Sequence, residues 1–152
     1  MANNKKQLRN FIDQVWNQQN MDAINHFVTD DYVEHTPFGD FNGADEFRGF
    51  VSMNLRAFPD FSVRIHEIIA ENDWVACYYT SSGTHKKEYL GIDPTNNRMD
   101  VNGCYMGRMQ NGKVLEAWHQ FDVMTLLTGL EVITPDMLGG MEEMGGGRGM
   151  RG

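Results

Sequence analysis

The sequence predicts an α+β fold in which helices pack on one face of an antiparallel sheet. Up to Pro59, apolar residues recur mostly at the three- and four-residue spacing of amphipathic helices. After Pro59 they alternate with polar residues, which is the period of a strand with one wet face. The Asn111-Gly112 pair between two strand-like segments is a strong hairpin signal. Helices first and paired strands afterwards favour a helical layer on one side of a sheet.

The N-terminal part predicts helices separated by an extended piece. The expected elements are a helix over 8–16, a short helix over 21–28, an extended piece over 30–37 and a helix over 42–58. Pro59 ends the last of these, because proline cannot continue a helix. Asn54 falls on the apolar stripe of that helix, so its amide is expected to point at the core.

The C-terminal part predicts a meander of strands. The expected elements are strands over 61–66, 74–85, 99–110 and 113–122, followed by a short helix over 123–130. The second strand is nearly all apolar or small, which is typical of a central strand covered on both faces. The connection over 86–98 is expected to turn at Asp93-Pro94.

We expect one domain over residues 1–136 and a flexible tail over residues 137–152. The chain of 152 residues suits a single core. The last 16 residues include seven Gly and four Met without periodicity. Their "GRGMRG" matches the dinucleotide-binding fingerprint only formally, because no helix can follow it.

Composition excludes several classes of partner. A net charge of −8 and a pI near 5.0 argue against nucleic acid and anionic membranes. The chain begins without a signal-peptide core and has no apolar run of membrane-spanning length. Cys77 and Cys104 do not make a disulfide framework, so we expect buried thiols in a reducing cytoplasm.

The sequence contains no recognisable motif for binding a metal or a cofactor. It contains no nucleophile elbow and no Walker loop. The five histidines lie in different elements without the spacing of a metal site. We therefore expect no metal and no cofactor, and acid/base chemistry by side chains is the better candidate.

The last strand suggests where such chemistry could lie. A period of two places Glu116, Trp118, Gln120 and Asp122 on one face, with Val114 at its start, and the other face takes Leu115, Ala117, His119 and Phe121. If the first face meets the helices, Trp118 becomes an apolar wall and Asp122 a carboxylate at its edge. An apolar pocket raises the pKa of a carboxyl toward the range useful for proton transfer next to a carbonyl.

Alternatives remain open for each of these residues. Asp122 directly precedes the short helix over 123–130, so it can equally cap that helix. A slip of one residue would exchange the two faces, bringing His119 into the cavity and taking Asp122 out of it. His35 and His85 can be pocket bases or satisfied loop histidines, and Asn54 can line a cavity or bond a nearby backbone group.

Several segments resemble the SnoaL-like polyketide cyclases of the nuclear transport factor 2-like superfamily. The resemblance rests on "YVEHTP", "FPD", "GTH", "GIDPTNNR" and "NGKVLEAWHQFD", and it covers Leu8 to Leu130. It implies a cone-shaped, strongly curved antiparallel sheet that wraps the N-terminal helices and encloses an apolar cavity. It also implies an aldol-type cyclisation without metal or organic cofactor. The aspartate that ends the family's W-x-x-x-D motif is Asp122 here, and the tryptophan of the motif is Trp118.

The leading hypothesis is a cofactor-independent acid/base enzyme acting on a small, apolar carbonyl compound. Asp122 would move the proton, and the residues expected to bind the substrate are Trp118, His35, Asn54, Trp16, His85 and Gln120. The alternative is a non-catalytic module that binds a small ligand or dimerises. A homodimer suits either reading, with Leu115, Ala117 and Phe121 packed against the second subunit.

Overall fold

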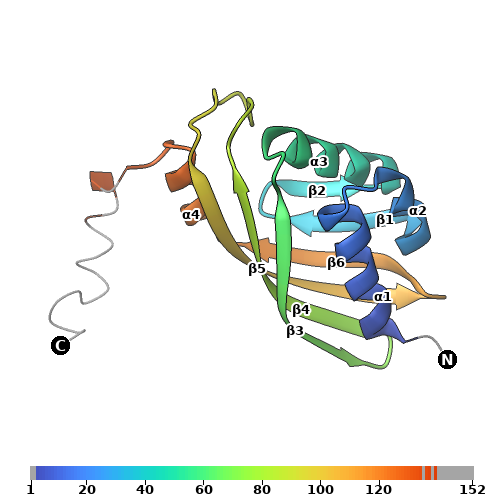
Figure 1. Ribbon diagram of the computed structural model, residues 1–152. Coiled ribbons are helices and arrows are strands. Elements are labelled where there is room, and N and C mark those ends of the chain that lie inside the picture. Colours follow the sequence, from blue (N-terminus) through green and yellow to red (C-terminus); the bar gives the residue numbers. More distant parts are fainter. Residues whose placement is uncertain (1–2, 135, 138, 140–152) are drawn as a thin grey trace, which may run out of the picture.

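The computed structural model describes residues 3–134, 136, 137 and 139 as a curved six-stranded sheet with helices on one side (Figure 1). The helical elements are α1 (Asn4–Phe11), the π-helix η1 (Ile12–Asn17), the 3₁₀-helix η2 (Met21–Ala23), α2 (Ile24–Phe27), α3 (Ala44–Ala57) and α4 (Val123–Gly129). The strands are β1 (Val28–Thr36), β2 (Gly39–Asn42), β3 (Ser62–Glu71), β4 (Trp74–Thr84), β5 (Arg98–Gln110) and β6 (Lys113–Phe121). The predicted α+β fold, with helices on a strongly curved sheet, is confirmed.

The sheet has the strand order β2-β1-β6-β5-β4-β3. Strands β3 to β6 form the expected antiparallel meander, and the β5–β6 hairpin turns at Asn111 and Gly112, whose φ angles are 52° and 82°. Strand β1 adds to β6 in parallel, which the sequence analysis did not foresee. This pairing places residues from the two ends of the domain side by side.

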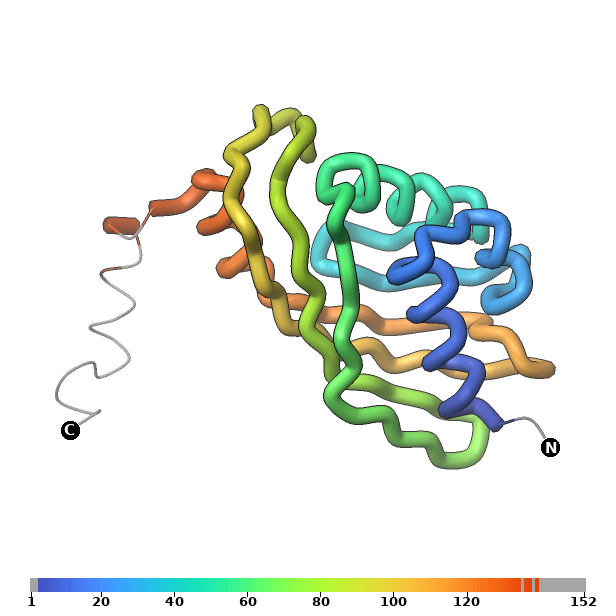
Figure 2. Tube along the Cα trace, viewed as in Figure 1, coloured from blue at the N-terminus to red at the C-terminus, as the bar shows by residue number. Residues whose placement is uncertain are grey.

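The helices α1, α2 and α3 cover the concave face of the sheet, whereas α4 lies on the other side of β5 in this view (Figure 2). Asn3 caps α1 by accepting a hydrogen bond from the backbone N–H of Lys6. The side chain of Asn17, at the end of η1, makes two hydrogen bonds to the backbone of Val63 in β3. The larger core cluster joins apolar residues of α1, α3 and the inner face of the sheet.

A bulge in β6 changes which residues face the helices. Glu116 pairs with Arg108 and Val114 with Met109, so Leu115 has no partner in β5. Because of this extra residue, Val114 and Ala117 both point inward and are buried. The expected alternation along β6 is therefore wrong beyond Leu115, and the slip of one residue that was left open is what the strand adopts.

Three smaller expectations also need correction. Strand β4 is open on its outer face, where Tyr78 is 44% exposed, so it is not covered on both faces in this chain. The connection after β4 turns at Leu90 and Gly91, both with positive φ, rather than at Asp93-Pro94. Tyr89 and Ile92 close this turn with two backbone hydrogen bonds. The third helix starts at Ala44, because Gly43 has a φ of 92° that cannot belong to a helix.

The expected tail over residues 137–152 lies almost entirely outside the described residues. Within the described part of the chain, no helix is long and apolar enough to cross a membrane.

Candidate active site

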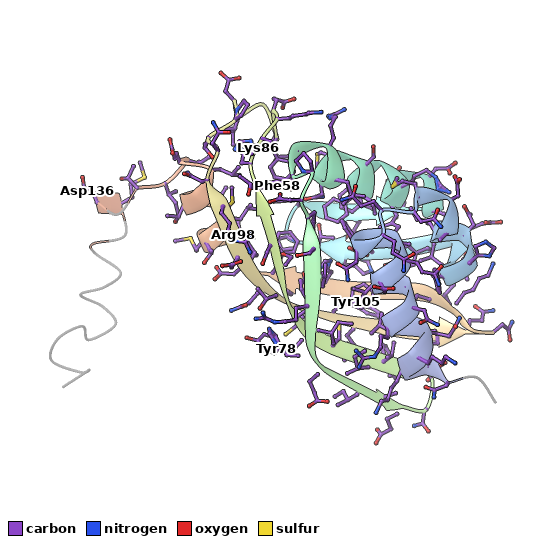
Figure 3. All side chains as sticks on the ribbon, in the orientation of Figure 1. Phe58, Tyr78, Lys86, Arg98, Tyr105 and Asp136 are labelled. Carbon is purple, nitrogen blue, oxygen red and sulfur yellow. The ribbon has the colours of Figure 1, made fainter. Side chains whose placement is uncertain are left out.

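Two small chambers lie between the helices and the inner face of the sheet. The first has a volume of about 80 Å³ and the second a volume of about 50 Å³. In Figure 3, the labelled Phe58 marks the first chamber, next to the end of α3, and the labelled Tyr105 marks the second, beneath α1. Trp16, Phe61 and Tyr79 line both chambers and so form the partition between them.

The first chamber has mainly aromatic walls with a few polar groups. Its aromatic residues are Trp16, Phe50, Phe58, Phe61, Tyr79, Tyr89 and Phe121. The polar groups include the Asn54 amide, the Ser81 hydroxyl and the hydroxyls of Tyr79 and Tyr89. The Tyr89 hydroxyl donates to Asn54 Oδ1 at 2.9 Å, and Asn54 Nδ2 donates to the Phe50 carbonyl at 2.8 Å. The lining is therefore mainly aromatic, with a few uncharged polar residues.

A buried chain of hydrogen bonds connects this chamber to a carboxylate. Tyr79 in β4 bonds through its hydroxyl to His119 Nε2 in β6. His119 Nδ1 lies 2.9 Å from Glu34 Oε2 in β1. Glu34 is 1% exposed, and the His119 side chain is 12% exposed. A carboxylate on one ring nitrogen fixes the tautomer and leaves the other nitrogen to accept a proton.

The other oxygen of Glu34 is also satisfied from inside the protein. Tyr32 donates its hydroxyl hydrogen to Glu34 Oε1 at 2.5 Å, and the Tyr105 hydroxyl lies 2.7 Å from that of Tyr32. Since Tyr32 has a single hydrogen and gives it to Glu34, Tyr105 must be the donor to Tyr32. Burying a carboxylate without such partners would be strongly unfavourable.

A glycine in β5 makes the chain of hydrogen bonds possible. Tyr79 is paired with Gly103, which in turn is paired with Phe121 of β6. A methyl group on Gly103 would overlap the ring and hydroxyl of Tyr79. Because Gly103 has no side chain, Tyr79 can lie across β5 and reach His119 on the far strand.

Burial keeps the hydroxyls of this site protonated. Desolvation, followed by the nearby Glu34 carboxylate, raises the pKa of Tyr79 well above its usual range. Burial likewise raises the pKa of Tyr89. A tyrosinate is therefore disfavoured here, so Tyr79 can accept a proton only while it passes its own to His119.

Two of the residues expected at the site line the first chamber. Asn54 lies there through its position on α3, and Trp16 reaches it from η1. Irregular π turns inside helices are frequent at functional sites. That Asn54 and Trp16 bind a substrate stays a prediction.

Asp122 does not line either chamber. Its carboxylate caps α4, accepting from the Thr125 backbone N–H at 3.1 Å and from the Thr125 hydroxyl at 2.6 Å. These hydrogen bonds lower the pKa of Asp122, whereas the sequence analysis expected it to be raised. The bulge at Leu115 explains the difference, because it turns Asp122 away from the concave face.

Trp118, Gln120 and His35 lie on the outer face of the sheet, contrary to expectation. Trp118 and Gln120 line a shallow groove of about 450 Å³ there. His35 stacks near Trp118, with ring centroids 5.4 Å apart. Its two ring nitrogens lie 2.8 Å from Asp40 and 2.7 Å from Glu116, and these hydrogen bonds raise the pKa of His35.

His85 is fully buried beside the first chamber but does not line it. Its ring stacks on Phe58, with centroids 5.6 Å apart. The Thr95 backbone N–H donates to His85 Nδ1 at 3.1 Å, so Nε2 carries the hydrogen of the neutral ring. Nε2 has no partner among the described residues. The expectation that His85 holds a substrate oxygen remains a prediction.

The sequence analysis missed Glu34, Tyr79 and Tyr105. One signal for Glu34 was present in the sequence. Glu34 is two residues after Tyr32, so both side chains point to the buried face of β1. His119 was named only as the outcome of a slip in register. The reach of Tyr79 across Gly103 depends on strand pairing, which no local pattern reveals.

Comparisons with known proteins agree with the fold. Residues 6–130 match the family of SnoaL-like polyketide cyclases. A structure from Jannaschia sp. CCS1, a proposed SnoaL-like polyketide cyclase, matches with a TM-score of 0.79 and 19% identity, over 86% of this chain and 93% of its own. Among curated protein sequences, no relative matches.

Two Streptomyces structures are also similar. AclR from Streptomyces galilaeus, a proposed hydroxylase, has a TM-score of 0.75 and 27% identity over 86% of this chain and 97% of its own. IdmH from Streptomyces antibioticus, a proposed polyketide cyclase, has a TM-score of 0.75 and 21% identity over 86% and 99%. With the family match spanning most of its length, this chain belongs to the SnoaL-like polyketide cyclase family.

Proposed function

We propose that this protein is a cofactor-independent acid/base enzyme that acts on a small, apolar carbonyl compound in the first chamber. The observation that carries the proposal is Tyr79, which lines that chamber and whose hydroxyl is hydrogen-bonded to His119. The fold family supports an aldol-type cyclisation or a related proton transfer. Because the family name alone does not fix a reaction, the proposal depends on this geometry.

The reaction begins when the carbon next to the carbonyl loses a proton. Tyr79 accepts that proton at its oxygen and passes its own hydrogen to His119 Nε2, so no tyrosinate forms. The electron pair of the C–H bond moves to the carbonyl oxygen and gives an enolate. The resulting imidazolium is stabilised by Glu34, which keeps its hydrogen bond to Nδ1.

The enolate needs a hydrogen-bond donor on its oxygen. Asn54 uses one amide hydrogen on the Phe50 carbonyl and has a second that this bond does not use. In an aldol step, the enolate carbon bonds to a second carbonyl carbon, whose oxygen becomes an alkoxide. His119 then returns its proton through Tyr79 to that alkoxide, which restores the starting state.

Exchange of the hydrogens next to a carbonyl for deuterium tests this proton transfer directly. Proton NMR in D₂O would follow acetone and acetophenone with the wild-type protein. His119→Gln and Tyr79→Phe should each slow exchange by about 100-fold or more, as expected when a general acid/base is lost. Asp122→Asn should retain exchange, because asparagine caps a helix about as well as aspartate.

Three results would contradict the proposal. Loss of exchange in Asp122→Asn, with retention in His119→Gln, would return the catalytic role to the aspartate of the family motif. Full exchange in Tyr79→Phe would show that the Tyr79 hydroxyl does not pass the proton to His119. Binding of the ketones without any exchange would favour the non-catalytic ligand-binding module. Thermal unfolding of each variant checks that it has folded.

Homodimer formation and a cytoplasmic location belong to the same proposal. The outer face of the sheet exposes Ile69, Tyr78 and Met106 beside the 450 Å³ groove, and apolar faces of this kind usually meet a partner. These residues replace Leu115, Ala117 and Phe121 in the expected interface, because Ala117 is buried under the helices. Both cysteines are free thiols, which suits a reducing compartment, but only Cys77 is buried, and Cys104 is exposed contrary to expectation.

A further inference from the structure

The second chamber differs from the first in what it offers a ligand. Its lining includes Glu34, Tyr79 and Tyr105, which carry a carboxylate and two hydroxyls, among otherwise apolar residues. Cys77 also lines it, and burial raises the pKa of its thiol to about 12, so the sulfur stays neutral. Of the described residues that line either chamber, none is Lys or Arg. A negatively charged ligand would find no counter-charge there.

The partition between the chambers includes one side chain that is only half-buried and lies outside the regular strands. Phe61 lies in the connection just before β3, is only half-buried and packs on Trp16 with ring centroids 5.1 Å apart. Its backbone N–H donates to the Phe58 carbonyl, and a rotation of the side chain leaves that bond intact. Turning the Phe61 ring would join two chambers, each of which is too small for a two-ring compound.

We propose that the second chamber is an extension of the ligand site, opened by Phe61, that takes the hydroxyl-bearing end of a flat, uncharged aromatic compound. The aromatic partition favours flat rings, and the absence of Lys and Arg from both linings favours an uncharged ligand. Each Glu34 oxygen accepts one hydrogen bond and can accept a second, which a ligand hydroxyl supplies. This inference rests on the proposed function in taking the first chamber as the place of the reacting carbonyl.

Calorimetric titration with 2-naphthol and 2-methoxynaphthalene tests the extension without any turnover. The two compounds share their rings, but only 2-naphthol can donate a hydrogen bond. Wild-type protein should bind 2-naphthol about tenfold more tightly, the ratio expected for one hydrogen bond to a charged acceptor. Phe61→Ala should raise the affinity for 2-naphthol several-fold. Phe41→Ala, which removes a ring outside both chambers, should leave that affinity unchanged.

A variant that fills the second chamber provides the decisive comparison. Cys77→Leu should abolish the preference for 2-naphthol. If Cys77→Leu lowers the unfolding temperature too far, Val63→Leu, which fills the same chamber from β3, replaces it. Equal affinity of wild-type protein for both compounds would overturn the inference, as would a preference that survives filling. A preference that is lost on filling, in a protein that exchanges no ketone hydrogens, would uphold the extension while the acid/base function fails.

Discussion

His35 lies between the carboxylates of Asp40 and Glu116, and these contacts link the β1–β2 hairpin to β6. Hydrogen bonds from its ring to the carboxylate of Glu116, and then to that of Asp40, raise the pKa of His35 above the usual value near 6.5. A group whose pKa is raised on folding adds stability below its unfolded pKa and loses it as pH rises through the folded pKa. The ion pairs are partly exposed, so their contribution is modest.

His35→Gln should therefore lower the free energy of unfolding at pH 6 by about 1 kcal/mol or less and have a smaller effect at pH 9. Urea unfolding at both pH values measures the difference. His66→Gln is the matched control, because the His66 ring contacts the neutral hydroxyl of Thr80. An equal loss at both pH values would mean that packing against Trp118, rather than charge, explains the effect of His35.

Single residues also show why the sequence could not assign the site. Asp122 ends the family motif and precedes a helix, and both readings were compatible with its neighbours in sequence. Only the hydrogen bonds to Thr125 distinguish them. The inward positions of Asn54 and Trp16 followed from helical spacing, which decides which side of a helix meets the core.

At the scale of elements, the helices, the meander and the hairpin at Asn111-Gly112 follow from local patterns, whereas the faces of β6 do not. A bulge of one residue at Leu115 exchanges those faces, and nothing in "KVLEAW" marks it. The parallel pairing of β1 with β6 was equally hidden, since it joins segments that are far apart in the chain. These two features bring Glu34 and His119 together.

A substitution at Gly103 tests how the strands position the hydrogen bond between Tyr79 and His119. Gly103→Ala should displace the Tyr79 ring, break its hydrogen bond to His119 and slow ketone exchange about as much as Tyr79→Phe. We expect a loss of about 1–3 kcal/mol in stability from overpacking. Gly49→Ala is the control, because a methyl group at Gly49 of α3 meets nothing within 4 Å. A Gly103→Ala protein that exchanges normally would show that Tyr79 does not need this passage.

At the scale of the whole molecule, the two sides of the sheet differ in what they enclose and expose. The concave side encloses the two chambers, and the outer side exposes Ile69, Tyr78 and Met106 around a shallow groove. The family resemblance indicated a cavity and the apolar residues of the last strand indicated a dimer face, but the bulge in β6 moved Trp118 from the first side to the second.

Light scattering after size-exclusion chromatography tests the outer face. Tyr78→Glu combined with Met106→Glu should convert a dimer to a monomer, because two buried charges would then lack partners. Leu90→Glu provides the control, since Leu90 is 46% exposed, close to the 44% of Tyr78, but lies in the turn after β4. A wild-type monomer, or a dimer that survives both charges, would contradict the proposed interface.

The parallel pairing of β1 with β6 has a consequence for the order of folding. Glu34 and His119 stand 85 positions apart, so their contact closes a loop that spans most of the domain. While the chain is being synthesised, Glu34 emerges from the ribosome early and remains hydrated until the final strand docks. A nascent chain that lacks β6 therefore cannot form the contact between Glu34 and His119, so this contact is among the last that the domain can make.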